Sequence, residues 1–241
     1  MLDLLCLPCA GASATMYWRW RRWLPRWVNL VPVELPGRGA RLDEPYAADF
    51  DGLVDQLCDE LSERPPARSW ALLGHSMGAL LACGVARTLR VRGRALPQAI
   101  FVSGSAAPAR RDPLRFVGKD DDGTLTADLH RQGGTPPEVF DSPELLRITL
   151  DTLAADYRVC ASFAHRPCAP LPLTVHALGG LSDDIATEDV EAWQCEAAGG
   201  FSVRWFEGRH FFIREHEQQV VQHIVRCLQP LHEDSESLAR A

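Results

Sequence analysis

Residues 70–81 read WALLGHSMGALL, and this stretch decides the fold class. Its first four residues form an apolar run with the length of a buried strand, and the pattern that follows predicts a helix over residues 77–90. Between them, Gly74-His75-Ser76-Met77-Gly78 matches G-x-S-x-G, a sharp turn between strand and helix that exposes a serine hydroxyl. Glycine is required at both ends because a side chain there would collide with a neighbouring strand or helix. The stretch therefore predicts that Ser76 is a nucleophile. The alternative is a glycine-flanked turn that has no catalytic role.

The rest of the chain alternates short apolar runs with helical patterns. Helices are expected where apolar residues recur at four-residue steps, as at Leu53, Leu57 and Leu61. The expected strands are residues 3–7, 28–34, 70–73, 99–103, 173–178 and 201–206. The expected helices are residues 14–23, 50–64, 77–90, 188–197 and 212–228. Such alternation predicts an α/β fold with a mainly parallel sheet and helices on both faces.

Residues 105–170 separate two expected core strands by far more chain than a crossover needs. The segment shows helical patterns at residues 125–131 and 143–164, with Pro136-Pro137 as a break between them. We interpret it as a helical lid over the carboxyl edge of the sheet, where open α/β sheets bind their ligands. A structural insertion without a role in substrate access is the alternative.

Composition points to one acidic, well-packed domain. The chain has 241 residues, of which 46% are apolar, so it can fill one hydrophobic core. We expect residues 1–241 to form a single domain with a polar, frayed tail at residues 233–241. Lys and Arg number 25 against 32 Asp and Glu, which leaves a net charge of -7. A nucleic-acid partner is not expected, because binding one needs a positive field that displaces counterions from phosphates.

The sequence shows neither a secretory signal nor a membrane span. Residues 4–7 are apolar, but they follow Asp3 and run into Pro8 with no basic segment ahead. No single helical pattern is long enough to cross a bilayer. We therefore expect a cytoplasmic protein without a membrane partner.

The eight cysteines are scattered through apolar segments and are expected to be reduced core residues. Cys6 and Cys9 form a C-x-x-C pair, a spacing found in zinc and redox sites. No second close pair of Cys or His completes a tetrahedral site, so no bound metal is expected.

A serine hydroxyl needs a base, oriented by a carboxylate, to act as a nucleophile. Of the eight histidines, His210 is the best candidate because it follows the strand at residues 201–206 and precedes the last helix. Asp183 follows the strand at residues 173–178 and is the favoured acid, with its neighbour Asp184 as the alternative. The order serine, acid, histidine is the order that this fold class uses.

Two backbone N–H groups are needed to hold the oxyanion that develops on the substrate. One is expected from Met77, the residue after the nucleophile. The other should come from the loop after the first strand, residues 8–12, whose small side chains let the backbone approach a substrate closely. We assign it to Ala10.

Five segments carry a family resemblance. They are LPCAG at residues 7–11, ELPGRG at 34–39, GHSMGALL at 74–81, FVSG at 101–104 and FEGRHFF at 206–212. Together they resemble a type II thioesterase, a free-standing α/β hydrolase that accompanies polyketide synthases and nonribosomal peptide synthetases. The resemblance runs from about residue 3 to residue 228 and includes the lid.

The resemblance implies an α/β-hydrolase fold and hydrolysis of an acyl thioester on the phosphopantetheine arm of an acyl or peptidyl carrier protein. Such hydrolysis frees carriers blocked by wrong or stalled groups. By motif match, Ser76, Asp183 and His210 correspond to the catalytic triad, and Ala10 and Met77 to the oxyanion donors. No bound cofactor is implied, because the phosphopantetheine belongs to the partner.

Two features depart from the family pattern. Cys9 stands where the family usually has an aromatic residue, which bears on the shape of the mouth of the acyl pocket. The segment between Asp183 and Trp193 is one residue shorter than usual, which keeps Asp184 as an alternative acid.

Some alternatives stay open at this point. Arg19, Arg21, Arg22 and Arg26 alternate with tryptophans in one short segment of an acidic chain. They either steer an acidic carrier protein or form a solvated helix face whose tryptophans lie in the core. A small-molecule carboxylesterase or lipase on the same scaffold is a rival function, and so is a non-catalytic hydrolase-like module that only binds a partner.

Overall fold

The computed structural model describes residues 1–66 and 69–240, with side chains as far as residue 233. In this part of the chain, six parallel strands form one sheet in the order β2-β1-β3-β4-β5-β6. The strands are β1 (Leu2–Leu7), β2 (Val28–Pro32), β3 (Ser69–His75), β4 (Ala99–Ser103), β5 (Thr174–Gly180) and β6 (Phe201–Phe206). Every predicted strand is present, and β4 and β6 have the predicted bounds.

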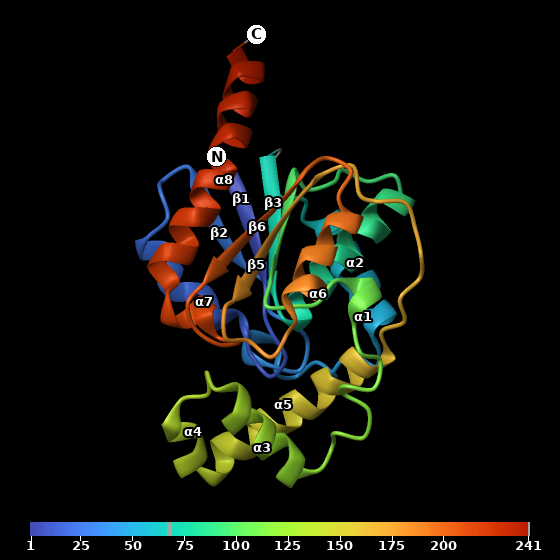
Figure 1. The fold of residues 1–241 in the computed structure, drawn as a ribbon, viewed down its shortest axis with the longest axis vertical. Coiled ribbons are helices and arrows are strands. Elements are labelled where there is room, and N and C mark those ends of the chain that lie inside the picture. The colour runs from blue at the N-terminus through green and yellow to red at the C-terminus, as the bar shows by residue number, and fades with distance from the viewer. Residues whose placement is uncertain (67–68, 241) are drawn as a thin grey trace.

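Helices cover both faces of the sheet (Figure 1). One face carries α1 (Phe50–Glu63), α2 (Met77–Val91), α6 (Thr187–Glu191) and the 3-10 helix η4 (Ala192–Glu196). The other face carries the 3-10 helix η1 (Ala14–Arg22), α7 (Phe212–Glu215) and α8 (Glu217–Arg240). The layered α/β architecture expected from the sequence is confirmed.

Successive residues of the central strands contribute to two separate cores. Leu72 and Val102 pack in the core that α1 and α2 cover. Their neighbours Leu73 and Phe101 pack in the core that η1 and α8 cover. Because both faces of these strands are buried, they appear in the sequence as continuous apolar runs rather than alternating ones.

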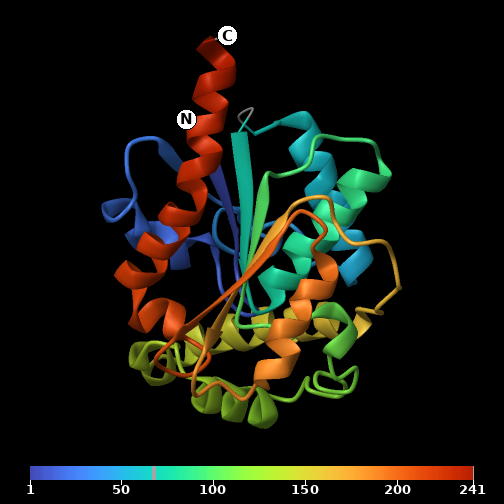
Figure 2. The same cartoon turned by 45° about the horizontal axis from the view of Figure 1, so that its top comes forward.

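The segment between β4 and β5 crosses the carboxyl ends of the strands (Figures 1 and 2). It contains η3 (Pro108–Arg110), α3 (Asp122–Gln132), α4 (Pro137–Asp141) and α5 (Pro143–Ser162). Leu125, Leu153 and Tyr157 belong to a small core of its own. The segment therefore packs as a helical unit over the edge of the sheet to which the candidate site was assigned.

Residues 14–23 do not form the α-helix expected from the sequence. The structure has the 3-10 helix η1 there, and its buried residues Ala14, Tyr17 and Trp20 recur every third position. A 3-10 helix has three residues per turn, so this spacing puts all three side chains on one face. The α-helical expectation is wrong because the pattern of buried residues has the tighter period.

Two helix boundaries also differ from the prediction. The expected break at Pro136-Pro137 is present, since α3 ends at Gln132, but the short helix α4 that begins at Pro137 was not predicted; proline suits the first turn of a helix. The last helix divides at His216 into α7 and α8. The helix α8 continues to Arg240, through residues predicted to fray, in a stretch whose Glu, Leu, Ala and Arg favour helix. Ala241 lies outside the described residues.

The cysteines are free, but they are not all core residues. Cys6, Cys9, Cys58, Cys83 and Cys160 are buried and Cys227 is partly buried. Cys168 and Cys195 are exposed, on the loop before β5 and on η4, so the core prediction is wrong for these two.

The arginine and tryptophan segment lies mainly on the surface. Trp20 is buried, but 57% of Trp18 is exposed. Arg19 and Arg22 both pair with Glu217 of α8. The segment is a solvated face with only part of its tryptophans in the core, and carrier steering stays a prediction. None of the described helices combines the length and the apolar character needed to cross a membrane.

The contact between α2 and β1 generates a test of the fold. A Cβ atom at Gly78 would overlap the backbone oxygens of Leu7 and Pro8, whereas at Gly84 of the same helix it would meet only side chains of α1. A side chain can shift to relieve an overlap more easily than the backbone can. Gly78→Ala should therefore lower the free energy of unfolding by about 2 kcal/mol more than Gly84→Ala does. Urea unfolding of both variants measures the difference, and equal losses would contradict the packing described.

Candidate active site

Ser76 occupies the turn between β3 and α2 in a strained conformation. Its φ of 55° and ψ of -114° lie where L-residues are rare, and no other described non-glycine residue has a positive φ. Its N–H donates to the carbonyl of Ser103 at 2.7 Å. A Cβ atom at Gly74 would overlap the carbonyl of Gly78, so only glycine fits there. Backbone contacts on several sides therefore hold Ser76 at the carboxyl edge of the sheet.

His210 lies in the loop between β6 and α7, against an acidic partner. Its Nδ1 is 2.9 Å from Oδ2 of Asp183, and the two side chains are only 8% and 5% exposed. The other oxygen of Asp183 accepts the N–H of Asp184 at 2.7 Å. Asp184 is itself exposed. An ionised Asp183 keeps the proton of a neutral His210 on Nδ1 and leaves Nε2 as an acceptor.

The loops that carry these two residues are bonded to each other. The N–H of Leu181 donates to the carbonyl of Phe206, and the N–H of Ser182 donates to the carbonyl of Gly208, both at 2.9 Å. These bonds continue the β5–β6 pairing beyond the ends of the strands. The pair of Asp183 and His210 is therefore fixed by backbone as well as by its own hydrogen bond.

Ser76 and His210 line the same cavity, of about 270 Å³. Met77 also lines it, and the insertion contributes Arg111 and Phe116. No hydrogen bond between the Ser76 hydroxyl and His210 is present among the described contacts. Such bonds are often long in unliganded sites and shorten when the substrate binds. His210 thus contacts Asp183 directly, whereas Ser76 and His210 line the same cavity with no described hydrogen bond between them.

The predicted oxyanion donors lie on two neighbouring backbone segments. Met77 is the first residue of α2, so its N–H is among those without a partner inside the helix. Ala10 lies in a turn closed by the N–H of Ala12 and the carbonyl of Cys9, at 3.1 Å. A Cβ atom at Gly78 would overlap backbone of the residues just before this turn. The start of α2 and the turn after β1 are therefore in close contact.

His75 is a site residue that the sequence identified only as a neighbour of the nucleophile. It is fully buried, its Nδ1 lies 3.0 Å from the hydroxyl of Ser103, and its ring centre is 5.0 Å from that of His210. Burial, followed by the charges of His210 and Arg214, holds the pKa of His75 well below its usual value. The ring is neutral at pH 7 and supports the ring of His210.

An ion pair beneath the insertion was not foreseen. Asp156 of α5 binds both Arg38, in the loop after β2, and the N–H of Gly11, beside Ala10. The only sequence signal was Arg38 in the motif ELPGRG, since nothing marks Asp156 as its partner so far along the chain.

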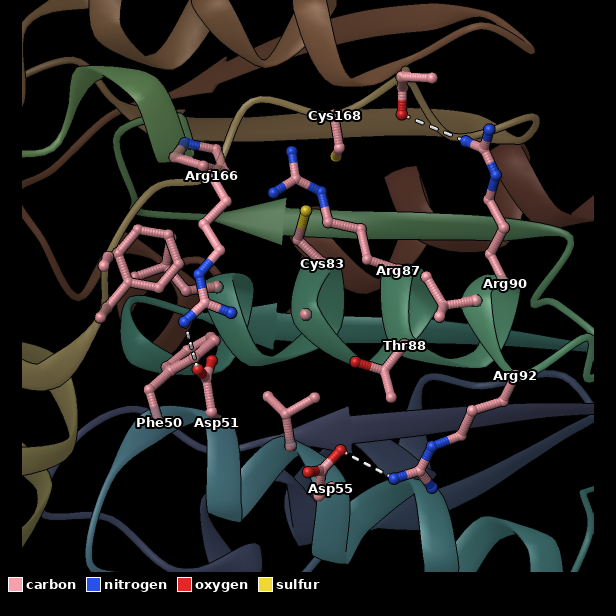
Figure 3. A pocket seen from close by; sticks show the side chains of 18 residues that line it. Phe50, Asp51, Asp55, Cys83, Arg87, Thr88, Arg90, Arg92, Arg166 and Cys168 are labelled. Atoms are coloured by element: carbon pink, nitrogen blue, oxygen red, sulfur yellow. Dashed lines mark hydrogen bonds and ion pairs between the residues drawn. The ribbon is translucent and has the colours of Figure 1, made fainter.

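Two further cavities differ in chemistry. One of about 440 Å³ is lined by Cys9, Ala10, Leu129, Leu153 and Phe211, among others, so it reaches the turn after β1 from the side of the insertion. Another, of about 570 Å³, lies over α1 and α2 (Figure 3).

The cavity over α1 and α2 is lined by two free thiols, Cys83 and Cys168, and its described lining residues include no histidine that could act as a base. Its buried thiol is Cys83, whose pKa burial raises to about 12, so the sulfur stays protonated. At its rim, Arg92 pairs with Asp55 and Arg166 pairs with Asp51 (Figure 3). The cavity at Ser76 is therefore the better candidate for chemistry.

Comparison with known proteins supports the same conclusion. The model of the family described as "Thioesterase domain" matches residues 3–228. Thioesterase PikA5 of Streptomyces venezuelae is 33% identical, over 90% of this chain and 77% of its own length. The solved structure of the RedJ thioesterase from the prodiginine pathway of Streptomyces coelicolor has a TM-score of 0.85 and 35% identity, covering 93% of this chain and 89% of that one.

A second solved structure agrees closely. The type II thioesterase BorB from the borrelidin biosynthetic cluster has a TM-score of 0.85 and 35% identity, and covers 93% of this chain and 91% of that one. The resemblance noted in the sequence is thereby confirmed, and the chain belongs to the thioesterase family, as an enzyme of the α/β-hydrolase fold similar to the type II thioesterases.

Proposed function

We propose that the protein hydrolyses acyl thioesters on the phosphopantetheine arm of an acyl or peptidyl carrier protein, freeing carriers that hold wrong or stalled groups. The proposal rests on one arrangement: a serine in a strained turn shares a cavity with a histidine whose Nδ1 bonds a buried carboxylate. The relatives RedJ and BorB, from the prodiginine and borrelidin pathways, support a role in polyketide or nonribosomal peptide biosynthesis.

Ser76, His210 and Asp183 are proposed as the catalytic triad. His210 Nε2 takes the hydroxyl proton while the Ser76 oxygen attacks the thioester carbonyl, and Asp183 stabilises the resulting imidazolium. The N–H groups of Ala10 and Met77 hold the oxyanion of the tetrahedral intermediate. The carbon–sulfur bond then breaks, and the carrier leaves as its free thiol with the proton from His210.

The second half of the reaction uses the same groups. His210 takes a proton from water as the water attacks the acyl-Ser76 ester, and then returns a proton to the serine oxygen. The products are a carboxylic acid and the regenerated hydroxyl. The steps are complete with groups of this chain, and the phosphopantetheine arrives with the carrier, so we propose a reaction without a bound metal or cofactor.

We propose residues 105–170 as a lid. Arg111 and Phe116 of this segment line the cavity at Ser76, and Leu129 and Leu153 line the one at Ala10. One cavity is lined by Ser76 and His210 and the other by Ala10, so we propose that one takes the acyl chain and the other the pantetheine arm. Since the insertion covers both, displacement of its helices would control access. We also propose a cytoplasmic location, because the enzyme must meet its carriers there.

Replacement of the nucleophile tests the function. Ser76→Ala removes the attacking oxygen and should lower kcat for acyl carriers by about 10⁴-fold or more while the melting temperature stays close to that of the parent. The assay is a panel of acyl groups on carrier proteins, with free oxoesters beside them. A fluorophosphonate probe should label the parent and not the variant. Rapid oxoester cleavage without carrier hydrolysis would favour a carboxylesterase, and an unlabelled parent would favour a binding module.

Paired substitutions test the choice of acid. Asp183→Asn should lower kcat by about 10³- to 10⁴-fold, because an amide no longer holds His210 in the required tautomer or stabilises its charge. Asp184→Asn is the matched control, and its kcat should change by less than about threefold, since the exposed side chain does not bond His210. Steady-state hydrolysis of one acyl carrier measures both. A larger loss for Asp184→Asn would reverse the assignment.

A further inference from the structure

A buried carboxylate of the insertion binds the turn after β1. Asp156 Oδ2 accepts the N–H of Gly11 at 2.7 Å and Nη1 of Arg38 at 2.6 Å. Its Oδ1 accepts Nη2 of Arg38 at 2.6 Å, and Nη1 of Arg38 also donates to the carbonyl of Ala12 at 3.1 Å. The side chains of Arg38 and Asp156 are only 7% and 2% exposed. One buried ion pair therefore binds two successive residues of the turn.

Ala10 lies within this turn, between Cys9 and Gly11. The N–H of Ala12 donates to the carbonyl of Cys9 at 3.1 Å, and Gly11 has a φ of 75°. A glycine with positive φ at the third position is typical of a type II turn. In this geometry the N–H of Gly11 points outward from the turn and needs an acceptor, which Asp156 supplies. The peptide group between Ala10 and Gly11 cannot rotate without breaking the hydrogen bond from the Gly11 N–H to Asp156.

The ion pair is a costly way to stabilise the fold alone. Burial acts to lower the pKa of Arg38, yet the hydrogen bonds and the charge of Asp156 outweigh it and raise that pKa above its usual value. Nε of Arg38 is buried without a partner. Replacing a buried ion pair with apolar side chains is often neutral or stabilising, so stability by itself gives little reason for this pair. The bond to Gly11 is a contact that apolar side chains could not replace.

We propose that Asp156 is a positioning residue, which keeps the N–H of Ala10 directed at the developing oxyanion by holding the adjacent peptide, while Arg38 orients the carboxylate. The inference rests on the proposed function, because it presumes that Ala10 donates to an oxyanion. Asp156 belongs to α5, so one donor of the oxyanion hole is positioned by the insertion and not by the sheet alone. Movement of α5 would therefore weaken transition-state binding as well as open the cavity.

Two double variants separate positioning from stability. Both carry Arg38→Met, so neither leaves an unpaired buried charge. One adds Asp156→Asn, which keeps an oxygen that can accept the N–H of Gly11. The other adds Asp156→Leu, which has similar size and no acceptor. Arg38→Met with Asp156→Val is a second non-accepting variant in case leucine prevents folding.

Loss of the oxygen that accepts the Gly11 N–H should lower kcat and leave KM nearly unchanged. On acetyl-, butyryl- and hexanoyl-pantetheine, kcat of the Leu variant should be about 10- to 100-fold below that of the Asn variant, with KM within about threefold. Their melting temperatures should agree within about 5 °C. Affinity for a trifluoromethyl ketone analogue, which forms a tetrahedral adduct with a serine, should fall in parallel with kcat.

Equal kcat values for folded Asn and Leu variants would overturn the proposal, and so would a loss confined to KM. Ser76→Ala in the parent background is the control for the function itself. If that variant keeps its activity, the proposed triad fails. A fully active parent, an inactive Ser76→Ala and equal double variants would reject the role of Asp156 alone.

Discussion

The conformation of Ser76 is the constraint on which the site depends. A non-glycine residue in this region of φ and ψ costs about 1–3 kcal/mol and persists only where the surroundings enforce it. Around Ser76 the surroundings that enforce it are backbone groups. The carbonyl of Ser103 accepts the N–H of Ser76, and Gly78 packs on the backbone oxygens of Leu7 and Pro8. Three adjacent strands, β1, β3 and β4, thus act on one residue. Any change in their register would move the hydroxyl relative to every other group of the site.

The same topology explains how distant segments meet. In a parallel sheet all carboxyl ends lie at one edge, so the loops after β1, β3, β5 and β6 are neighbours although the chain between them is long. Asp183 and His210 gain additional order because their loops are bonded to each other beyond the strands. The insertion after β4 then closes over this edge. Its position follows from the sheet, and its small core around Leu153 keeps it together as a unit.

Local sequence patterns predicted the features that depend on neighbouring residues in the chain. The strands were identifiable because both of their faces are buried, and the elbow because glycine is sterically required on both sides of Ser76. The 3-10 helix at Tyr17 and Trp20 was missed because a three-residue period is easily mistaken for a helical one. The start of α4 at Pro137 was missed because proline both begins and ends helices. The pairing of Arg38 with Asp156, separated by 118 positions, leaves no local pattern, and only the fold brings the two together.

Two buried ion pairs near the reacting centre bear on the proposed chemistry. Asp183 faces His210, and Asp156 faces Arg38, each pair nearly excluded from water. When His210 takes a proton, the new imidazolium lies against a carboxylate that is already in place, which costs no reorganisation. A second charged ring 5.0 Å away would oppose that step, but burial keeps His75 neutral. The negative charge on the substrate oxygen is bound by backbone N–H groups in the proposed mechanism. This is why the geometry of the turn at Ala10 matters more than its side chain.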